Sequence, residues 1–216
     1  MKPAPAPASP KQYTIILFDL GNTVIRFDHG ISARKIAARC GTDEGKIYET
    51  FFDSALTRLF DSGKITPREF YMRVSRDLGL KIPYSDFVSV WSDIFWPDEA
   101  SCALARELKR THRLFIISNI NRLHFDFIME RFGDDMRLFE GYILSYQVGC
   151  LKPDRRIYED AARQGNARFS DILYIDDRED LIVESTAMGI DSIRFENAAQ
   201  LRDELIVKRI LKKKSK

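Results

Sequence analysis

The sequence is poor in cysteine and has no long apolar run. Its three cysteines, Cys40, Cys102 and Cys150, are isolated and form no C-x-x-C pair, which argues against a disulfide framework. No stretch approaches the ~20 apolar residues that are needed to span a bilayer. We therefore expect a soluble protein of a reducing compartment, located in the cytoplasm.

The net charge of the sequence is also small. Lys and Arg total 34 against 32 Asp and Glu, and a formal charge of +2 argues against a broad surface for polyanions. The positive excess lies mainly at Lys208, Arg209 and the lysines between positions 212 and 216. We interpret this segment as a solvated helix end, and we expect neither a nucleic-acid nor a membrane partner.

The first ten residues lack the apolar stretch of a signal peptide. They alternate Ala and Pro, a composition that cannot bury enough apolar surface to offset the entropy of ordering the chain. We expect residues 1–10 to be a disordered tail.

The rest of the sequence can build a sizeable core, because the chain has 216 residues of which 44% are apolar. Five short apolar runs predict strands, and helix-like segments follow them from the second run onward. The runs are residues 13–18, 114–117, 141–145, 172–175 and 192–195. This alternation predicts an α/β fold with three layers, in which helices cover both faces of a parallel sheet.

The stretch from about residue 27 to residue 102 breaks this alternation. It contains no convincing strand and is typical of four or five amphipathic helices. We therefore expect a core of residues 11–26 and 105–216, with an all-helical insert of residues 27–104 after the first strand. Its aromatic residues are expected to fill a small helical core, although Phe52, Trp91 and Trp96 could also face a ligand cleft, and we expect Arg58 to face solvent.

Polar side chains follow the ends of several predicted strands. Asp19 comes directly after the first run, and Ser118-Asn119 follows the second. Parallel sheets of this kind bind ligands at the carboxyl ends of their strands. A carboxylate there is partly desolvated and is the candidate nucleophile. The Ser118 hydroxyl, with backbone N–H groups of the next helix, can donate hydrogen bonds to a phosphate oxygen.

Two further charged motifs follow the later runs. Lys152-Pro153 comes after the third run, where a compact cation can neutralise a phosphate and a nearby carboxylate. The fourth run ends in Asp176 and Asp177. Adjacent carboxylates repel each other unless a cation lies nearby, so these acids together with Asp19 predict a Mg²⁺ site.

The order of these four motifs, with a helical insert after the first, resembles the haloacid dehalogenase superfamily of phosphohydrolases with a C1-type helical cap. The resemblance covers about residues 13–195. It implies a Rossmann-like core, a mobile cap and a phosphomonoester substrate, with Asp19 as the nucleophile that forms an aspartyl-phosphate. It also implies that Ser118, Asn119 and Lys152 bind the phosphoryl group.

The resemblance further implies that Mg²⁺ is held by Asp19, by Asp177 and by the backbone carbonyl of Gly21. Asp176 is then expected to act through a metal-bound water or a neighbouring contact. Asp180 completes a D-x-x-x-D spacing from Asp176, but Leu181 stands where many relatives carry Asn or Asp.

Gly21 is the main departure from the family pattern, which usually has a proton-donating aspartate two residues after the nucleophile. General acid–base catalysis contributes about 10² to 10⁴ in rate, so its loss should slow the enzyme without abolishing activity. Asp28 or His29 could replace the missing acid.

Three functions remain open. The first is a Mg²⁺-dependent phosphatase of a small phosphomonoester, such as a sugar phosphate or nucleotide. The second is a weakly active or non-enzymatic phosphate-binding protein. The third, a 2-haloacid dehalogenase, is disfavoured because dehalogenases of this superfamily lack the acid pair that Asp176 and Asp177 form. The sequence leaves open whether the protein is a monomer or a homodimer.

Overall fold

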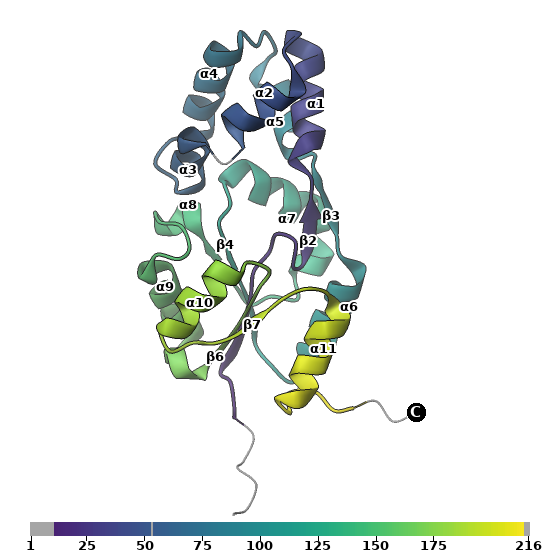
Figure 1. The fold of residues 1–216 in the computed structure, drawn as a ribbon, viewed down its shortest axis with the longest axis vertical. Coiled ribbons are helices and arrows are strands. Elements are labelled where there is room, and N and C mark those ends of the chain that lie inside the picture. Colours follow the sequence, from purple (N-terminus) through teal and green to yellow (C-terminus); the bar gives the residue numbers. More distant parts are fainter. Residues whose placement is uncertain (1–10, 53, 214–216) are drawn as a thin grey trace, which may run out of the picture.

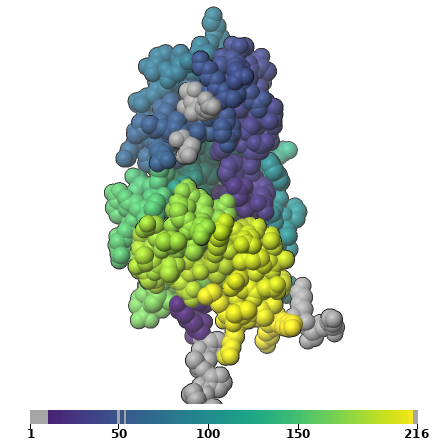
Figure 2. All heavy atoms as spheres, viewed as in Figure 1, coloured from purple at the N-terminus to yellow at the C-terminus, as the bar shows by residue number. Residues whose placement is uncertain are grey.

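The computed structural model describes residues 11–52 and 54–213 and has two lobes (Figure 1). The lower lobe holds the large sheet, and the upper lobe consists of helices from the first half of the chain. Figure 2 shows the same lobes as filled atoms, with the purple and blue upper lobe resting on the green and yellow lower one. The tail expected at residues 1–10 lies outside the described residues.

The lower lobe is built on a five-stranded parallel sheet in the order β5-β4-β1-β6-β7. Its strands are β1 (Ile15–Phe18), β4 (Leu114–Ser118), β5 (Gly141–Leu144), β6 (Ile172–Asp176) and β7 (Asp191–Arg194). All five predicted strands are therefore present, and the predicted α/β class is confirmed. β1 lies in the middle, between β4 and β6.

Helices cover both faces of this sheet because its strands bury side chains alternately on the two sides. In β1, Ile16 and Phe18 belong to one apolar cluster, whereas Ile15 and Leu17 belong to another. The first cluster is closed by α6 (Glu99–Leu108), α7 (Arg122–Met136) and α11 (Ala198–Val207). The second is closed by α9 (Arg155–Gly165) and α10 (Glu179–Ala187).

The upper lobe, which we call the cap, has its own apolar core. It contains α1 (His29–Cys40), α2 (Glu44–Phe51), α3 (Ala55–Asp61), α4 (Pro67–Leu78) and α5 (Tyr84–Ser92). Phe70, Phe87 and Trp91 are fully buried at its centre. The helix ends follow capping rules. α4, for example, begins with a Thr66–Glu69 capping box and ends at Gly79 in the left-handed conformation.

Two features of the predicted insert differ in the structure. The prediction that residues 27–102 contain no strand was wrong, because β3 (Phe95–Pro97) pairs with β2 (Ile25–Phe27) in an antiparallel ribbon. These strands have three residues each, which is too short for alternation to reveal them. The boundary placed at residues 104 and 105 falls inside α6, whose buried residues pack on the sheet.

Two further expectations concern membrane-spanning segments and disulfides. Among the described residues, no helix combines the length and apolar character that a membrane crossing requires. The three cysteines are free thiols, and Cys102 and Cys150 are buried.

Candidate active site

The candidate active site lies where the carboxyl ends of three adjacent strands meet. Asp19 follows β1, Ser118 ends β4 and Asp176 ends β6, so the central strand carries the predicted nucleophile between the other two. The Asp19 N–H donates to the Ile175 carbonyl at 2.8 Å and continues the pairing of β1 with β6. This topology brings Asp19 close to residues that lie at least 99 positions later in the chain (118 − 19 = 99).

Lys152 lies at the centre of the acidic residues. Its Nζ donates to Asp19 Oδ1 at 2.5 Å and to Asp176 Oδ2 at 2.7 Å, and its side chain is 3% exposed. Asn119 fixes the backbone of the same residue, since Lys152 N–H donates to Asn119 Oδ1 at 2.7 Å and Asn119 Nδ2 donates to the Lys152 carbonyl at 3.2 Å. The amide of Asn119 therefore orients the lysine from the neighbouring strand.

Asp176 is fully buried and bonded on both carboxylate oxygens. Oδ2 accepts from Lys152 and from the Tyr174 hydroxyl, while Oδ1 accepts the Arg178 N–H at 2.9 Å. Such a network holds the carboxylate and the ammonium in one geometry. Asp176 thus positions Lys152, and Asp177 is the more accessible member of the acid pair.

Burial and mutual repulsion perturb the acids of this site. Desolvation raises the pKa of Asp19 to about 7, with Lys152 opposing the shift and Asp176 and Asp177 adding to it. The pKa of Asp177 is raised by desolvation and then by Asp176. Burial alone would lower the pKa of Lys152, but Asp19 and Asp176 outweigh it and raise that pKa.

These residues fit a divalent cation. Asp19, Asp176 and Asp177 each place a carboxylate oxygen within 4.8 Å of the others. When all are ionised, the three carboxylates and the Lys152 ammonium leave two uncompensated negative charges (3 − 1 = 2). Oxygen ligands and this charge suit Mg²⁺, which would also relieve the mutual repulsion that adds to the effect of burial on the pKa values of Asp19 and Asp177.

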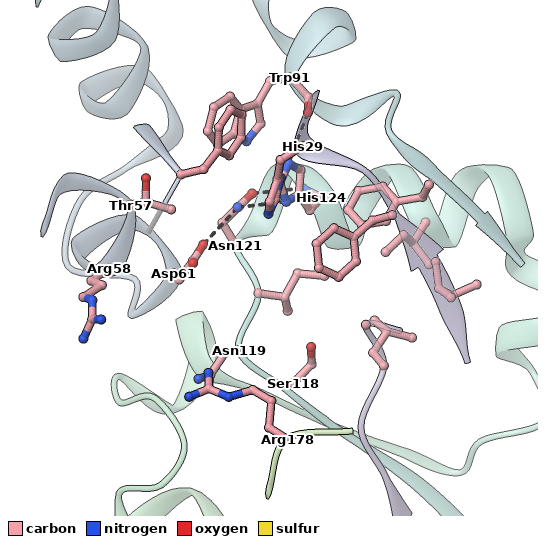
Figure 3. A pocket seen from close by; sticks show the side chains of 18 of the residues that line it. His29, Thr57, Arg58, Asp61, Trp91, Ser118, Asn119, Asn121, His124 and Arg178 are labelled. Atoms are coloured by element: carbon pink, nitrogen blue, oxygen red, sulfur yellow. Dashed lines mark hydrogen bonds between the residues drawn. The ribbon is translucent and has the colours of Figure 1, made fainter. Parts of the chain in front are cut away.

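A cavity of about 440 Å³ opens above these strand ends (Figure 3). Gly21, Ser118 and Asn119 line it from the core, so three of the predicted site residues face the space where a substrate can lie. The cap and the β2–β3 ribbon supply the opposite wall. The aromatic residues of this wall are Phe27, Tyr48, Phe52, Trp91 and Phe95, and its polar residues are His29, Thr57, Arg58 and Asp61.

Asp28 and His29, the two predicted substitutes for the missing acid, differ in their position relative to the cavity. Asp28 is exposed, caps α1 by accepting the Gly30 N–H at 2.7 Å, and does not line the cavity. It also pairs with Arg34 at 3.4 Å. His29 does line the cavity, and its ring stacks on Phe52 with centroids 4.4 Å apart.

The structure adds a polar network that the sequence did not reveal. Asn121 Nδ2 donates to Asp61 Oδ1 at 3.0 Å and lies 3.1 Å from His124 Nδ1, and His124 Nε2 lies 3.2 Å from the Trp91 carbonyl. The network joins the cap to the start of α7. Its members are 30 or more residues apart except for Asn121 and His124, which form the only local signal: an Asn cap followed three residues later by His.

Asp180 and Arg178 lie beside the acid cluster. Asp180 is 60% exposed and pairs with Arg178 at 2.6 Å, so it is not one of the three clustered carboxylates. Leu181 is buried. Arg178, which sequence analysis did not single out, also lines the cavity (Figure 3).

Comparison with known proteins agrees with this geometry. A family model described as a haloacid dehalogenase-like hydrolase matches residues 13–184. The chain belongs to this family. The family assignment made from the four motifs is confirmed, and with it the assignment of the protein as a hydrolase.

Three known proteins are similar to this chain over most of their length. D-ribitol-5-phosphate phosphatase of Bacteroides thetaiotaomicron is 21% identical over 89% of this chain and 96% of its own. A sesquiterpene phosphatase of Aspergillus oryzae is 24% identical over 81% and 85%. A haloacid dehalogenase family enzyme of B. thetaiotaomicron, solved with magnesium and inorganic phosphate, has a TM-score of 0.77 at 20% identity, covering 87% of this chain and 98% of its own.

Proposed function

We propose that the protein is a Mg²⁺-dependent phosphatase of a small phosphomonoester. The observation that carries this proposal is the buried Asp19 carboxylate, which Lys152 holds beside an acid pair, close to a cavity that Ser118 lines. The names of the two curated relatives, both phosphatases, support it.

In this proposal an Asp19 carboxylate oxygen forms a bond to phosphorus while the bond from phosphorus to the leaving oxygen breaks. The leaving oxygen then takes up a proton from solvent water. Water next attacks the phosphorus of the aspartyl-phosphate, which releases inorganic phosphate and restores the Asp19 carboxylate. Lys152 keeps its proton throughout, because its pKa is raised, and balances the charge of Asp19 and the phosphoryl group.

The other residues bind and orient the phosphoryl group and the metal ion. Ser118 donates a hydrogen bond to the phosphoryl group, and Asn119 supports that contact by fixing Lys152. Asp19, Asp177 and the Gly21 carbonyl would hold Mg²⁺, with Asp176 beside them. When bound, the ion neutralises charge on the phosphoryl oxygens.

The cap of residues 27–104 would close over the substrate in this proposal, and its cavity wall would select it. A cytoplasmic enzyme that acts as a monomer or homodimer, without a nucleic-acid or membrane partner, is consistent with the low net charge. The prediction that Asp28 or His29 supplies the missing proton stays a prediction.

The test is a panel of phosphate esters, headed by 4-nitrophenyl phosphate, with and without Mg²⁺. We expect turnover that requires both the ion and Asp19, and its loss in Asp19→Asn. If Asp19-dependent turnover of every ester is absent while phosphate still binds, the protein is a phosphate-binding protein. Halide release from a 2-haloacid without metal would instead identify a dehalogenase.

A further inference from the structure

The Phe27 ring occupies the space in which a side chain at position 21 would begin. A Cβ built on Gly21 would lie 2.8 Å from Phe27 Cε1 and 3.4 Å from Phe27 Cδ1. Gly21 is not among the glycines with positive φ, so its backbone would accept another residue. The aromatic ring therefore replaces the usual carboxylate with an apolar surface two residues after the nucleophile.

Asp61 is the one carboxylate among the described residues that line the cavity, and His29 lines it with its ring packed against Phe27 and Phe52. Asp28 caps α1 and is not among the residues that line the cavity. His124 is buried with both ring nitrogens in hydrogen-bond contact, and desolvation lowers its pKa to about 3, so it is neutral at pH 7. The Asp61 carboxylate accepts a hydrogen bond from Asn121 at the contact between cap and core.

The wall around Phe27 is aromatic and continuous. Phe27 lies 4.8 Å from His29 and 6.1 Å from Phe95, measured between ring centroids. His29 stacks on Phe52, and Phe52 stacks on Trp91 at 5.2 Å with ring planes 9° apart. Figure 3 shows Trp91, His29 and His124 close together above Ser118. A flat apolar group can stack on such a wall.

We infer that the preferred substrates are aryl phosphates, whose aromatic leaving group lies on this wall and departs without a proton from the enzyme. This inference rests on the proposed phosphatase function. A phenol has a pKa of about 10, like a tyrosine side chain. An alkyl alcohol is nearer the value of water, about 16. Only the phenolate leaves readily when no acid protonates it.

Three substrates test the two parts of the inference separately. One part is the departure of the leaving group without a proton from the enzyme, and the other is its binding to the aromatic wall. Phenyl and benzyl phosphate have similar size and apolarity but differ in the pKa of the leaving oxygen. Benzyl phosphate and ribitol 5-phosphate are both esters of a primary alcohol but differ in apolarity. The value of kcat/KM reports the step in which Asp19 displaces the leaving group, so it is the quantity to compare.

We expect kcat/KM for phenyl phosphate to exceed that for benzyl phosphate by at least ~100-fold, the lower limit of what a general acid contributes. We expect benzyl phosphate to exceed ribitol 5-phosphate by at least ~10-fold, because its ring leaves water on binding. Equal values for phenyl and benzyl phosphate would overturn the inference, as would a preference for ribitol 5-phosphate. No Asp19-dependent turnover, even of 4-nitrophenyl phosphate, would instead contradict the proposed function.

Variants at Gly21 and Phe27 test whether the missing acid causes the preference for aryl phosphates. Gly21→Asp alone should not gain activity on benzyl phosphate, because Phe27 blocks the new side chain. The double variant Gly21→Asp, Phe27→Ala should lower the phenyl-to-benzyl ratio at least ~10-fold relative to Gly21→Asn, Phe27→Ala, which has the same shape without the acid. An unchanged ratio in this pair would contradict the assignment.

Two further variants test the remaining cavity residues as donors. His29→Gln and Asp61→Asn should leave the phenyl-to-benzyl ratio within a few-fold of wild type. A rise of ~100-fold in that ratio in either variant would identify that residue as a proton donor and overturn the inference.

Discussion

The strand ends below the cavity and the wall of the cavity are built from opposite materials. The strand-end layer, which we call the floor, consists of Asp19, Lys152 and Asp176, which do not line the cavity itself and are buried, charged and joined by hydrogen bonds of 2.5 and 2.7 Å. The wall, from the cap and the β2–β3 ribbon, combines five aromatic side chains with the polar residues His29, Thr57, Arg58 and Asp61. The first arrangement is suited to handling a phosphoryl group, and the second to holding an apolar group.

The difference assigns separate tasks to the two lobes. Buried charges tolerate little change, because removing one partner leaves the other unpaired in a low dielectric. Stacked rings tolerate substitution more readily, since dispersion contacts can be partly replaced by other apolar groups. We therefore expect changes in the floor to affect all substrates, and changes in the wall to affect some substrates more than others.

Asp19→Asn should have the largest effect on activity. We expect kcat for every phosphate ester to fall by at least ~10⁴-fold, as when nucleophiles of other covalent enzymes are removed. The protein should remain folded, because the neutral amide is cheaper to bury than a carboxylate whose pKa burial raises to about 7. Steady-state kinetics and thermal unfolding of the same preparation check both expectations. Retention of more than a tenth of the activity on any ester would contradict the assignment of the catalytic step to the residues of the floor.

Lys152→Met should have the largest effect on stability. It leaves Asp19 and Asp176 without their shared cation, and we expect the free energy of unfolding to fall by about 3 to 5 kcal/mol in metal-free buffer. Urea denaturation measures this quantity. The surface variant Lys35→Met is the control, because the Lys35 pair with Asp93 at 2.8 Å is partly exposed and should contribute at most ~1 kcal/mol.

Asp176 and Asp177 should respond differently to the same substitution. Asp176→Ala breaks contacts with Lys152, Tyr174 and Arg178, and we expect it to lower the free energy of unfolding by about 3 kcal/mol. Asp177→Ala should lower it by less than ~1 kcal/mol without metal but should abolish the rise in Tm that Mg²⁺ causes in the wild type. A Mg²⁺ response that survives in Asp177→Ala would contradict its role as a ligand.

Some of this arrangement follows from local sequence and some does not. The five core strands lie in short apolar runs, and Asp19, Ser118 and Asp176 stand at the ends of three of them, so both these strands and the polar residues at their ends could be predicted. β3 has three residues and gives no periodic signal, which is why the ribbon was missed. The Gly21 and Phe27 contact depends on a turn and on ribbon pairing, and neither residue type alone indicates it.

Asp61→Asn should have the smallest effect among these variants. It weakens one hydrogen bond between cap and core, from Asn121 Nδ2 at 3.0 Å, and we expect a loss of about 1 kcal/mol in the free energy of unfolding. Activity on aryl phosphates should change by no more than a few-fold. Calorimetry and kinetics test this, with Asn121→Ala as a comparison that also removes the cap of α7 and should cost about 1 kcal/mol more.

The most direct test of the central claim is to detect the phosphoryl group on Asp19. The enzyme is mixed with 4-nitrophenyl phosphate and Mg²⁺, quenched in acid within one turnover, and digested for peptide mass spectrometry. The account predicts an acyl phosphate on the peptide that contains Asp19, and none in Asp19→Asn. Full turnover with no phosphoryl group on that peptide at any quench time, or with the group on another residue, would contradict it.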